Sequence, residues 1–325
     1  MIPDFDLPLA QLHEFDGELD FRGKRLRTAA GDLGDISFRA TLKDGVLRVD
    51  PFRVRGWAGA LIESDASIDA AQNPPEISWQ WVARQLDYGL LLEQAGFAET
   101  VEGTLDITLR LAGKGRTLHE ILGDANGQLI IVGQGGRFGS RRLDLWGSDL
   151  VTTMLSPSWR REDVTDLNCL VARVGIENGV ASSDSLLVDT RRITIGAAGT
   201  LDLGREDLNL VIAPRPKRIS LVSLTNPVRV TGTMGAPKVA VTVLPRNRTA
   251  AAGAGVLAGL VNPGYLIFTF TQTGSRQSNP CVAAIEKAMI MKGRPDEPDG
   301  LTPAAPPARF SLLPGCTRTV PRRVQ

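Results

Sequence analysis

The chain is poor in the residues that most often carry catalysis or hold metal ions. Its 325 residues include two histidines, His13 and His119, far apart, and three cysteines without a C-x-x-C pair. A structural zinc site needs closely spaced Cys and His ligands. No G-x-S-x-G elbow occurs, and the G-x-G-x-x-A match at 253–258 has no acidic residue before Glu286 and no βαβ context. We therefore expect no catalytic residues, no cofactor and no metal site.

Net charge, aromatic residues and long apolar runs are also scarce. The formal net charge is +1 and aromatic residues make up 5% of the chain. Nucleic-acid-binding domains usually carry a basic patch, so no nucleic-acid partner is expected. The longest uncharged apolar piece, 256–261, is stopped by Pro263, far short of the ~20 residues that cross a bilayer. No signal peptide or membrane anchor is visible in this chain.

What the sequence does contain is strict alternation of apolar and polar residues. Leu105, Ile107, Leu109 and Leu111 alternate with Asp106, Thr108 and Arg110, and Ile36, Phe38, Ala40 and Leu42 alternate in the same way. Ile77, Trp79 and Trp81 share one strand face, as do Ile193 and Ile195. Period-2 alternation predicts strands with one buried face.

Turn signals separate these strands. Asp44-Gly45 and Asn178-Gly179 each stand between two β-prone runs, which predicts tight hairpins with positive φ at the glycines. The similar spacing of the strands that follow the two turns suggests a repeated β unit. Residues 1–30 are weakly patterned, and their charges indicate a solvated edge strand that discourages edge pairing.

These patterns predict a mainly β fold, a long twisted antiparallel sheet curled into a groove or open barrel. The hydrophobic period changes to that of a helix near 86–95, 141–155 and 280–291, and Thr117 with Glu120 forms a T-x-x-E capping box. We expect a β unit over 1–115, a second over 116–248, an Ala/Gly-rich segment with a helix over 249–292, and a disordered Pro-rich tail over 293–325.

An ordered series of short motifs carries a family resemblance. The series begins at Asn168-Cys169 and passes through Leu187-Val188-Asp189-Thr190, the stretch from Gly199 to Leu203, and Pro214-Arg215-Pro216-Lys217 to Asn226-Pro227-Val228. It resembles the C-terminal region of AsmA-family proteins, with a match over roughly residues 30–290. Members carry β-grooves with apolar interiors between the two membranes of diderm bacteria. Members also have an N-terminal membrane anchor, so the resemblance implies a fragment, a misplaced start or a split gene.

The resemblance implies a periplasmic, inner-membrane-associated protein that is attached only through a segment absent from this chain. It further implies phospholipid acyl chains as ligands and a role in outer-membrane biogenesis or lipid transport. Groove candidates are the inward-facing apolar residues Ile36, Phe38, Leu42, Trp79, Leu105, Ile107, Leu109, Leu111, Ile193 and Ile195. The same pattern also builds a packed sandwich core, so a structural module that assists outer-membrane assembly proteins without carrying lipid stays open.

The three cysteines permit one further expectation. Cys169 falls in a predicted strand and is interpreted as a small buried apolar side chain. Cys281 and Cys316 flank the last predicted helix and the tail. The oxidising compartment of the family favours a bridge between Cys281 and Cys316, with two unpaired thiols as the alternative.

Overall fold

The computed structural model describes residues 2–28, 31–94, 101–139, 164–191, 193–217, 227–241, 281, 284 and 285. These residues belong to one compact unit, which extends from Met1 to Met289. The sequence-based helix at 141–155 and the tail at 293–325 lie outside the described residues.

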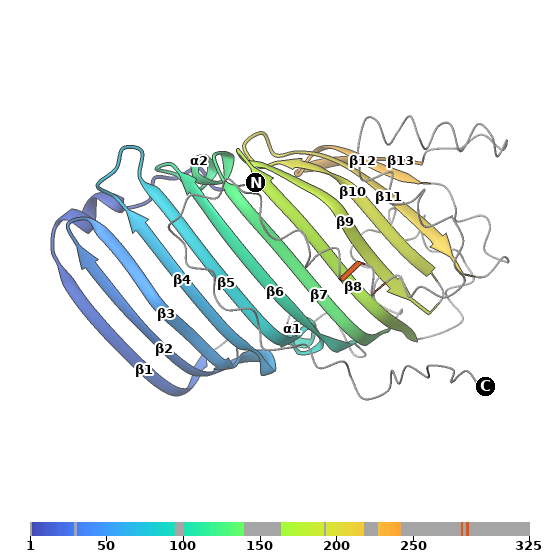
Figure 1. Cartoon of the computed structure of the whole chain (residues 1–325), viewed down its shortest axis with the longest axis horizontal. Helices are drawn as coiled ribbons and strands as arrows, with labels where there is room; N and C mark the ends of the chain where they lie inside the picture. Colours follow the sequence, from blue (N-terminus) through green and yellow to red (C-terminus); the bar gives the residue numbers. More distant parts are fainter. Residues whose placement is uncertain are drawn as a thin grey trace, which may run out of the picture. The chain divides into compact units, whose positions relative to one another are not determined.

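The described part of the chain forms one open antiparallel sheet of thirteen strands, in which each strand pairs with its neighbours in sequence (Figure 1). The strands are β1 (Gly17–Thr28), β2 (Gly31–Lys43), β3 (Val46–Gly56), β4 (Leu61–Asp69), β5 (Glu76–Asp87), β6 (Val101–Lys114), β7 (Asn126–Gly139), β8 (Val164–Glu177), β9 (Val180–Thr190), β10 (Ile193–Asp202), β11 (Asp207–Pro216), β12 (Val228–Thr233) and β13 (Ala236–Val241). The sheet is twisted and does not close, because β1 and β13 lie at its opposite ends (Figure 1). The predicted fold class is therefore confirmed, and β1 is the edge strand that the charged N-terminal region indicated.

Both predicted hairpin turns are present. Gly45 has φ +78° and Gly179 has φ +74°, and the residues before them, Asp44 and Asn178, also have positive φ. Two successive residues with positive φ match the twist of the flanking strands. At Gly179 the backbone approach is also close, because a Cβ atom there would lie 2.1 Å from the carbonyl oxygen of Gly123.

Six connections line up along one edge of the sheet. This short-turn edge consists of residues 44–45, 70–75, 115–125, 178–179, 203–206 and 234–235. Each connection donates one backbone hydrogen bond to the connection before it. The five bonds run from Ala70 to Gly45, Gly115 to Pro75, Gly179 to Ala125, Leu203 to Gly179 and Met234 to Glu206, with N···O distances of 2.8–3.0 Å. The edge is therefore a continuous hydrogen-bonded rim.

The N-terminal segment 2–16 follows this rim in the reverse direction. The backbone N–H of Ile2 donates to Glu206 Oε1 at 2.6 Å, and that of Leu7 donates to the Arg116 carbonyl at 2.9 Å. Further along, His13 Nε2 donates to the Ala70 carbonyl at 3.1 Å. The segment thus connects turns that are more than a hundred residues apart in sequence.

Short helices lie where strands are connected, at the short-turn edge of the sheet and at the opposite edge. Helix α1 (Tyr88–Gln94) follows β5, as the change of period near 86–95 predicted, and starts two residues later because Leu86 still belongs to β5. Helix α2 (Leu118–Gly123) lies at the short-turn edge and is capped by the Thr117 hydroxyl, which accepts from the Glu120 N–H at 3.1 Å. Two 3-10 turns, η1 (Leu9–His13) and η2 (Trp57–Gly59), complete the elements. Of the helix predicted at 280–291, residues 281, 284 and 285 are described, and they are helical.

Candidate functional site

The sequence-predicted groove residues all lie on one face of the sheet, because residues paired across antiparallel strands point to the same side. Ile36, Phe38 and Leu42 come from β2, Trp79 from β5, the four residues 105, 107, 109 and 111 from β6, and Ile193 and Ile195 from β10. Register pairs connect these strands without a change of face at the candidate positions. We call this side of the sheet the apolar face.

One row of the apolar face crosses eleven consecutive strands. Its members, each paired with the next, are Ile36, Val54, Ile62, Ala83, Ile107, Ile131, Ala172, Leu186, Ala197, Ile212 and Val228. Ten steps of about 4.8 Å between strands give a length of roughly 48 Å. Half of a bilayer core is about 15 Å thick, so the row is about three times as long as one acyl chain in a leaflet.

Part of this face is packed as an ordinary core. Val54, Ile62, Ala83 and Leu86 are at most 7% exposed and form a cluster with residues of η2. Ile107, Trp81 and Leu91 of α1 pack against the same cluster. The sequence could not tell a packed core from an open groove. In this part of the face the structure shows a packed core, and Ile107 packs against it. Leu42 and Ile193 are also buried, at 7% and 2% exposure.

Near α2, Leu111 packs against a second buried cluster of Ala125, Ile176 and Ala181. Away from these two clusters the face is more open. Trp79 is 43% exposed, with its indole N–H donating to Ser64 Oγ at 2.8 Å, so the polar atom of this side chain is satisfied while its ring faces outward. Over β9, β10 and β11 the open face is hollowed to about 230 Å³. Ser183, Leu186, Ile195, Ala197, Ala198, Leu210 and Ile212 line this hollow. Its accessible lining is apolar, and Ile195 is the predicted groove residue that it contains.

The opposite side, the polar face, carries ion pairs that cross between strands. Glu63 of β4 pairs with Arg53 of β3 at 3.4 Å and with Arg84 of β5 at 2.9 Å. The Arg84 hydrogen bond is the main cause that lowers the pKa of Glu63, and burial only partly opposes it. These side chains are all more than 40% exposed, so each pair contributes little to stability. The polar face of β3 to β5 is therefore solvated.

A larger hollow of about 460 Å³ lies on the polar face of β1 to β3. Asp20, Arg22, Arg39 and Arg53 contribute to its lining. Asp20 pairs with Arg22 and Arg39 at 3.2 Å each, and Arg53 pairs with Glu63. Its charges therefore satisfy one another at the surface, and we assign no ligand to this hollow.

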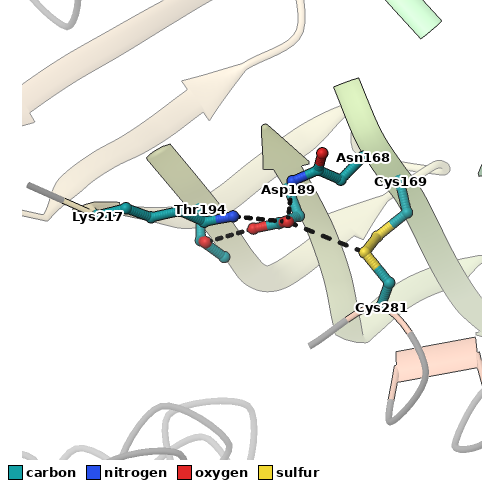
Figure 2. The surroundings of a disulfide bond; sticks show 6 residues. All are labelled: Asn168, Cys169, Asp189, Thr194, Lys217 and Cys281. Carbon is teal, nitrogen blue, oxygen red and sulfur yellow. Dashed lines mark hydrogen bonds and ion pairs between the residues drawn. A yellow bond between two sulfur atoms is a disulfide. The ribbon is translucent and has the colours of Figure 1, made fainter. Parts of the chain in front are cut away.

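The C-terminal helical residues attach to the polar face through a disulfide between Cys169 of β8 and Cys281 (Figure 2). The Cα atoms are 6.0 Å apart and the bond spans 112 residues. Cys169 is 1% exposed, and with Val171 it packs against Ala284 and Ile285. Cys169 is thus buried, as predicted from its strand. The predicted bridge between Cys281 and Cys316 is wrong, because the Cys281 sulfur is already bonded to Cys169; Cys316 lies outside the described residues.

A buried carboxylate stands beside this disulfide (Figure 2). Asp189, 2% exposed, accepts from Lys217 Nζ at 2.8 Å, Asn168 Nδ2 at 2.7 Å and Thr194 Oγ1 at 2.5 Å. Burial raises the pKa of Asp189, but the Lys217 ammonium and the two neutral donors outweigh it and hold the pKa below its ordinary value. The Sγ atom of Cys281 lies 4.0 Å away; a disulfide sulfur has no proton to donate, so this is a packing contact.

Neither the Asp189 cluster nor the hollow was found as such from sequence. Asp189 and Lys217 occur in the motifs that carry the family resemblance, but a charged residue in a strand normally indicates a solvated face. Leu186, Leu210 and Ile212, which line the hollow, are not among the groove candidates named from the sequence. Which strand residues line a hollow depends on how strands distant in sequence are aligned, and alternation within one strand does not contain that information.

Across the described ranges, no group of three or more His, Cys, Asp or Glu side chains is arranged to hold a metal ion. In the same part of the chain, none of the helices has the length and apolar character needed to cross a membrane.

Comparison with known proteins agrees with the resemblance. The model of the AsmA family matches residues 8–186. The AsmA family protein YhjG of Escherichia coli (strain K12) is 26% identical over 267 residues, which cover 82% of this chain and 38% of YhjG. The chain therefore spans well under half the length of this curated relative. No solved structure gives a significant match.

Proposed function

Because the chain belongs to the AsmA family, a family associated with the bacterial envelope, we propose that it binds phospholipid acyl chains along its apolar face during outer-membrane biogenesis. In this proposal it is non-enzymatic, and it acts in the periplasm, associated with the inner membrane in the full-length protein. The observation that carries the proposal is the hollow over β9 to β11, whose accessible lining is apolar and which continues the apolar row across the sheet.

The physical basis is transfer of CH₂ groups from water to this surface. Each buried CH₂ contributes about 0.8 kcal/mol, so a few methylenes held in the hollow outweigh the ordering of an acyl chain. Contact between exposed apolar surface and water is also unfavourable in free energy, and a ligand that covers the surface removes this contact. The polar face of β3 to β5 does not compete for acyl chains, because its ion pairs would lose solvent. On β8, Ala284 and Ile285 already pack against Cys169 and Val171 of that face.

The second candidate is a structural module that contacts outer-membrane assembly proteins without carrying lipid. The packed cluster around Val54, Ile62 and Ala83 favours it, since η2 and α1 fill that part of the apolar face with protein side chains. The two candidates differ in whether the open part of the face near Ile195 is occupied by lipid.

Ile107→Asp and Ile195→Asp separate the two parts of the face. Ile107 is half-buried and packs on the core cluster, so an aspartate there partly desolvates a charge against buried side chains and should lower the free energy of unfolding by about 2–3 kcal/mol. Ile195 lines the open hollow, so Ile195→Asp should cost about 1 kcal/mol or less and yet remove bound lipid. Asn209→Asp, on the polar face of β11, is the matched control.

The measurements are denaturant unfolding and mass spectrometry of phospholipid extracted from protein purified without detergent. The proposal predicts phospholipid in the wild type and in Asn209→Asp, and its loss from Ile195→Asp. Wild-type protein without phospholipid contradicts the proposal and favours the structural module. A folded Ile195→Asp variant that retains phospholipid contradicts the assignment of the hollow as the lipid-binding site.

A further inference from the structure

Strand β1 is a long strand whose outer edge has no partner among the described residues. From Gly17 to Gly23 it pairs with β2 in a regular register, and irregularity begins only after Gly23. Its outer backbone N–H and C=O groups are available to another strand. The other end of the sheet is less suited to pairing, because β13 has six residues and contains Pro237, which lacks an N–H, and Lys238.

The two faces of β1 differ in the same way as those of the rest of the sheet. Leu19 and Phe21 lie on the apolar face and are 55% and 38% exposed. Phe21 stacks on Phe38 with ring centroids 5.3 Å apart, and Phe38 stacks on Phe52 at 6.1 Å. The polar face of β1 carries Glu18, Asp20 and Arg22. The apolar face thus reaches the unpaired edge and ends there with exposed side chains.

We propose that β1 pairs with β1 of a second copy of this chain, antiparallel and centred on Phe21, so that two sheets join into one. In this register Phe21 lies opposite Phe21 of the partner copy, and Asp20 lies opposite Arg22 in both directions. Opposite charges directly across two strands stabilise the pair, and an aromatic pair adds to it. The two-fold axis stands perpendicular to the sheet, so both apolar faces point to the same side.

Other registers are disfavoured by the same residues. A slip by one residue places the apolar Phe21 among the charges of the polar face. Moving the centre to Asp20 or to Arg22 places two like charges opposite each other, which is destabilising. The charges that make β1 a poor partner for an unrelated strand therefore fit a second copy of β1 in one register.

The pairing does not depend on lipid binding. One strand pair buries less than the ~800 Å² per partner of a standard interface, so the association is weak and concentration-dependent. It also weakens with added salt, because the ion pairs that select the register are exposed and screened.

Charge exchange tests the register without changing the size of the strand. In Asp20→Arg the new arginine lies opposite Arg22 of the partner copy, and in Arg22→Asp the new aspartate lies opposite Asp20. Each variant alone should dimerise at least about 10-fold more weakly than wild type. In an equimolar mixture of the two variants every charge again faces its opposite, so the heterodimer should form within about three-fold of the wild-type affinity.

Sedimentation equilibrium of the full chain over a range of concentrations is the measurement, with circular dichroism to confirm that both variants fold. Lys238→Asp, on β13, is the control and should leave the dimer unchanged. Wild-type mass rising from 34.9 kDa toward twice that value, lost in both variants and restored in their mixture, supports the proposal. A monomeric wild type, assemblies larger than dimers, variants that dimerise like wild type, or a mixture that stays monomeric would overturn it.

Discussion

At the scale of single residues, Gly179 combines a left-handed backbone with a close approach of another backbone segment. Gly59 has nearly the same backbone, φ +71° against +74°, but a Cβ atom there would meet nothing within 4 Å. At Gly179 the same atom would lie 2.1 Å from the Gly123 carbonyl oxygen. A side chain at either position would adopt a strained left-handed conformation, but only at Gly179 would it also clash with a neighbouring backbone.

We expect Gly59→Ala to lower the free energy of unfolding by about 1–2 kcal/mol, the cost of a left-handed conformation with a Cβ. Gly179→Ala should cost about 1–3 kcal/mol more, because the rim must shift to admit the methyl group. Denaturant unfolding of both variants measures the difference. Equal midpoints would mean that the close approach at Gly179 is not present in solution.

Replacing Lys217 and replacing Asp189 should lower the free energy of unfolding by different amounts, because the partner that stays in place is buried in one case and exposed in the other. Lys217 is 35% exposed, whereas Asp189 is 2% exposed. Lys217→Met therefore leaves a buried carboxylate without its cation and should cost about 3 kcal/mol at neutral pH. Asp189→Asn leaves a lysine that reaches solvent, and should cost about 1–2 kcal/mol.

The contribution of Asp189 to stability should change with pH in opposite directions in the wild type and in the Lys217→Met variant. The pKa of Asp189 is lowered in the folded wild type, so its contribution is complete above the unfolded pKa of about 3.9 and is lost as pH falls through the folded value. Without Lys217, burial raises the folded pKa of Asp189, so the penalty should shrink as pH falls toward 4. Unfolding free energies at pH 4 and pH 7 test this; a penalty that does not change with pH would contradict it.

At the scale of elements, the disulfide fixes the C-terminal helical residues on the polar face of β8. Oxidation should stabilise the fold by about 4–5 kcal/mol in the loop-entropy model, since the bond closes a loop of more than a hundred residues. Cys169→Ala should remove this contribution, and Cys316→Ser is the control that should not. Unfolded, non-reduced protein should show one free thiol and, after digestion, a peptide linking residues 169 and 281. Three free thiols, or a link from 281 to 316, would contradict the assignment.

Individual strands and turns were the part of the fold most accessible from sequence. Alternation over 105–111 defined β6 and its apolar face, and Asn178-Gly179 defined a hairpin, because both signals are local. Disulfide connectivity is not local: Cys169 meets Cys281 only because residues 281, 284 and 285 pack on the polar face of the sheet. Pro214 within β11 also depends on non-local pairing: among the described residues, the pairing of β11 with β12 stops at Ile212, so Pro214 lies beyond the last of these pairs.

At the scale of the whole sheet, two parts of one face behave differently. Near η2 and α1 the apolar residues pack on protein, and near β9 to β11 they face an open hollow. The alternation of apolar and polar residues is the same in both regions. It therefore predicted which residues lie on the apolar face, but not which part of that face is packed and which part is open. If acyl chains bind as proposed, this division decides where on the face they bind, and the two sides of β11 are the place to test it.

The most direct measurement is site-specific photo-crosslinking at two adjacent residues of β11. Leu210 lines the hollow, and its neighbour Asn209 is exposed on the polar face. A photoreactive amino acid at each position, irradiated in the presence of phospholipid vesicles and analysed by intact mass, reports which face contacts lipid. Lipid binding along the apolar face predicts adducts at position 210 and none above background at 209. Equal labelling at both positions, or no adduct at 210, would contradict the assignment of the apolar face as the lipid-binding surface.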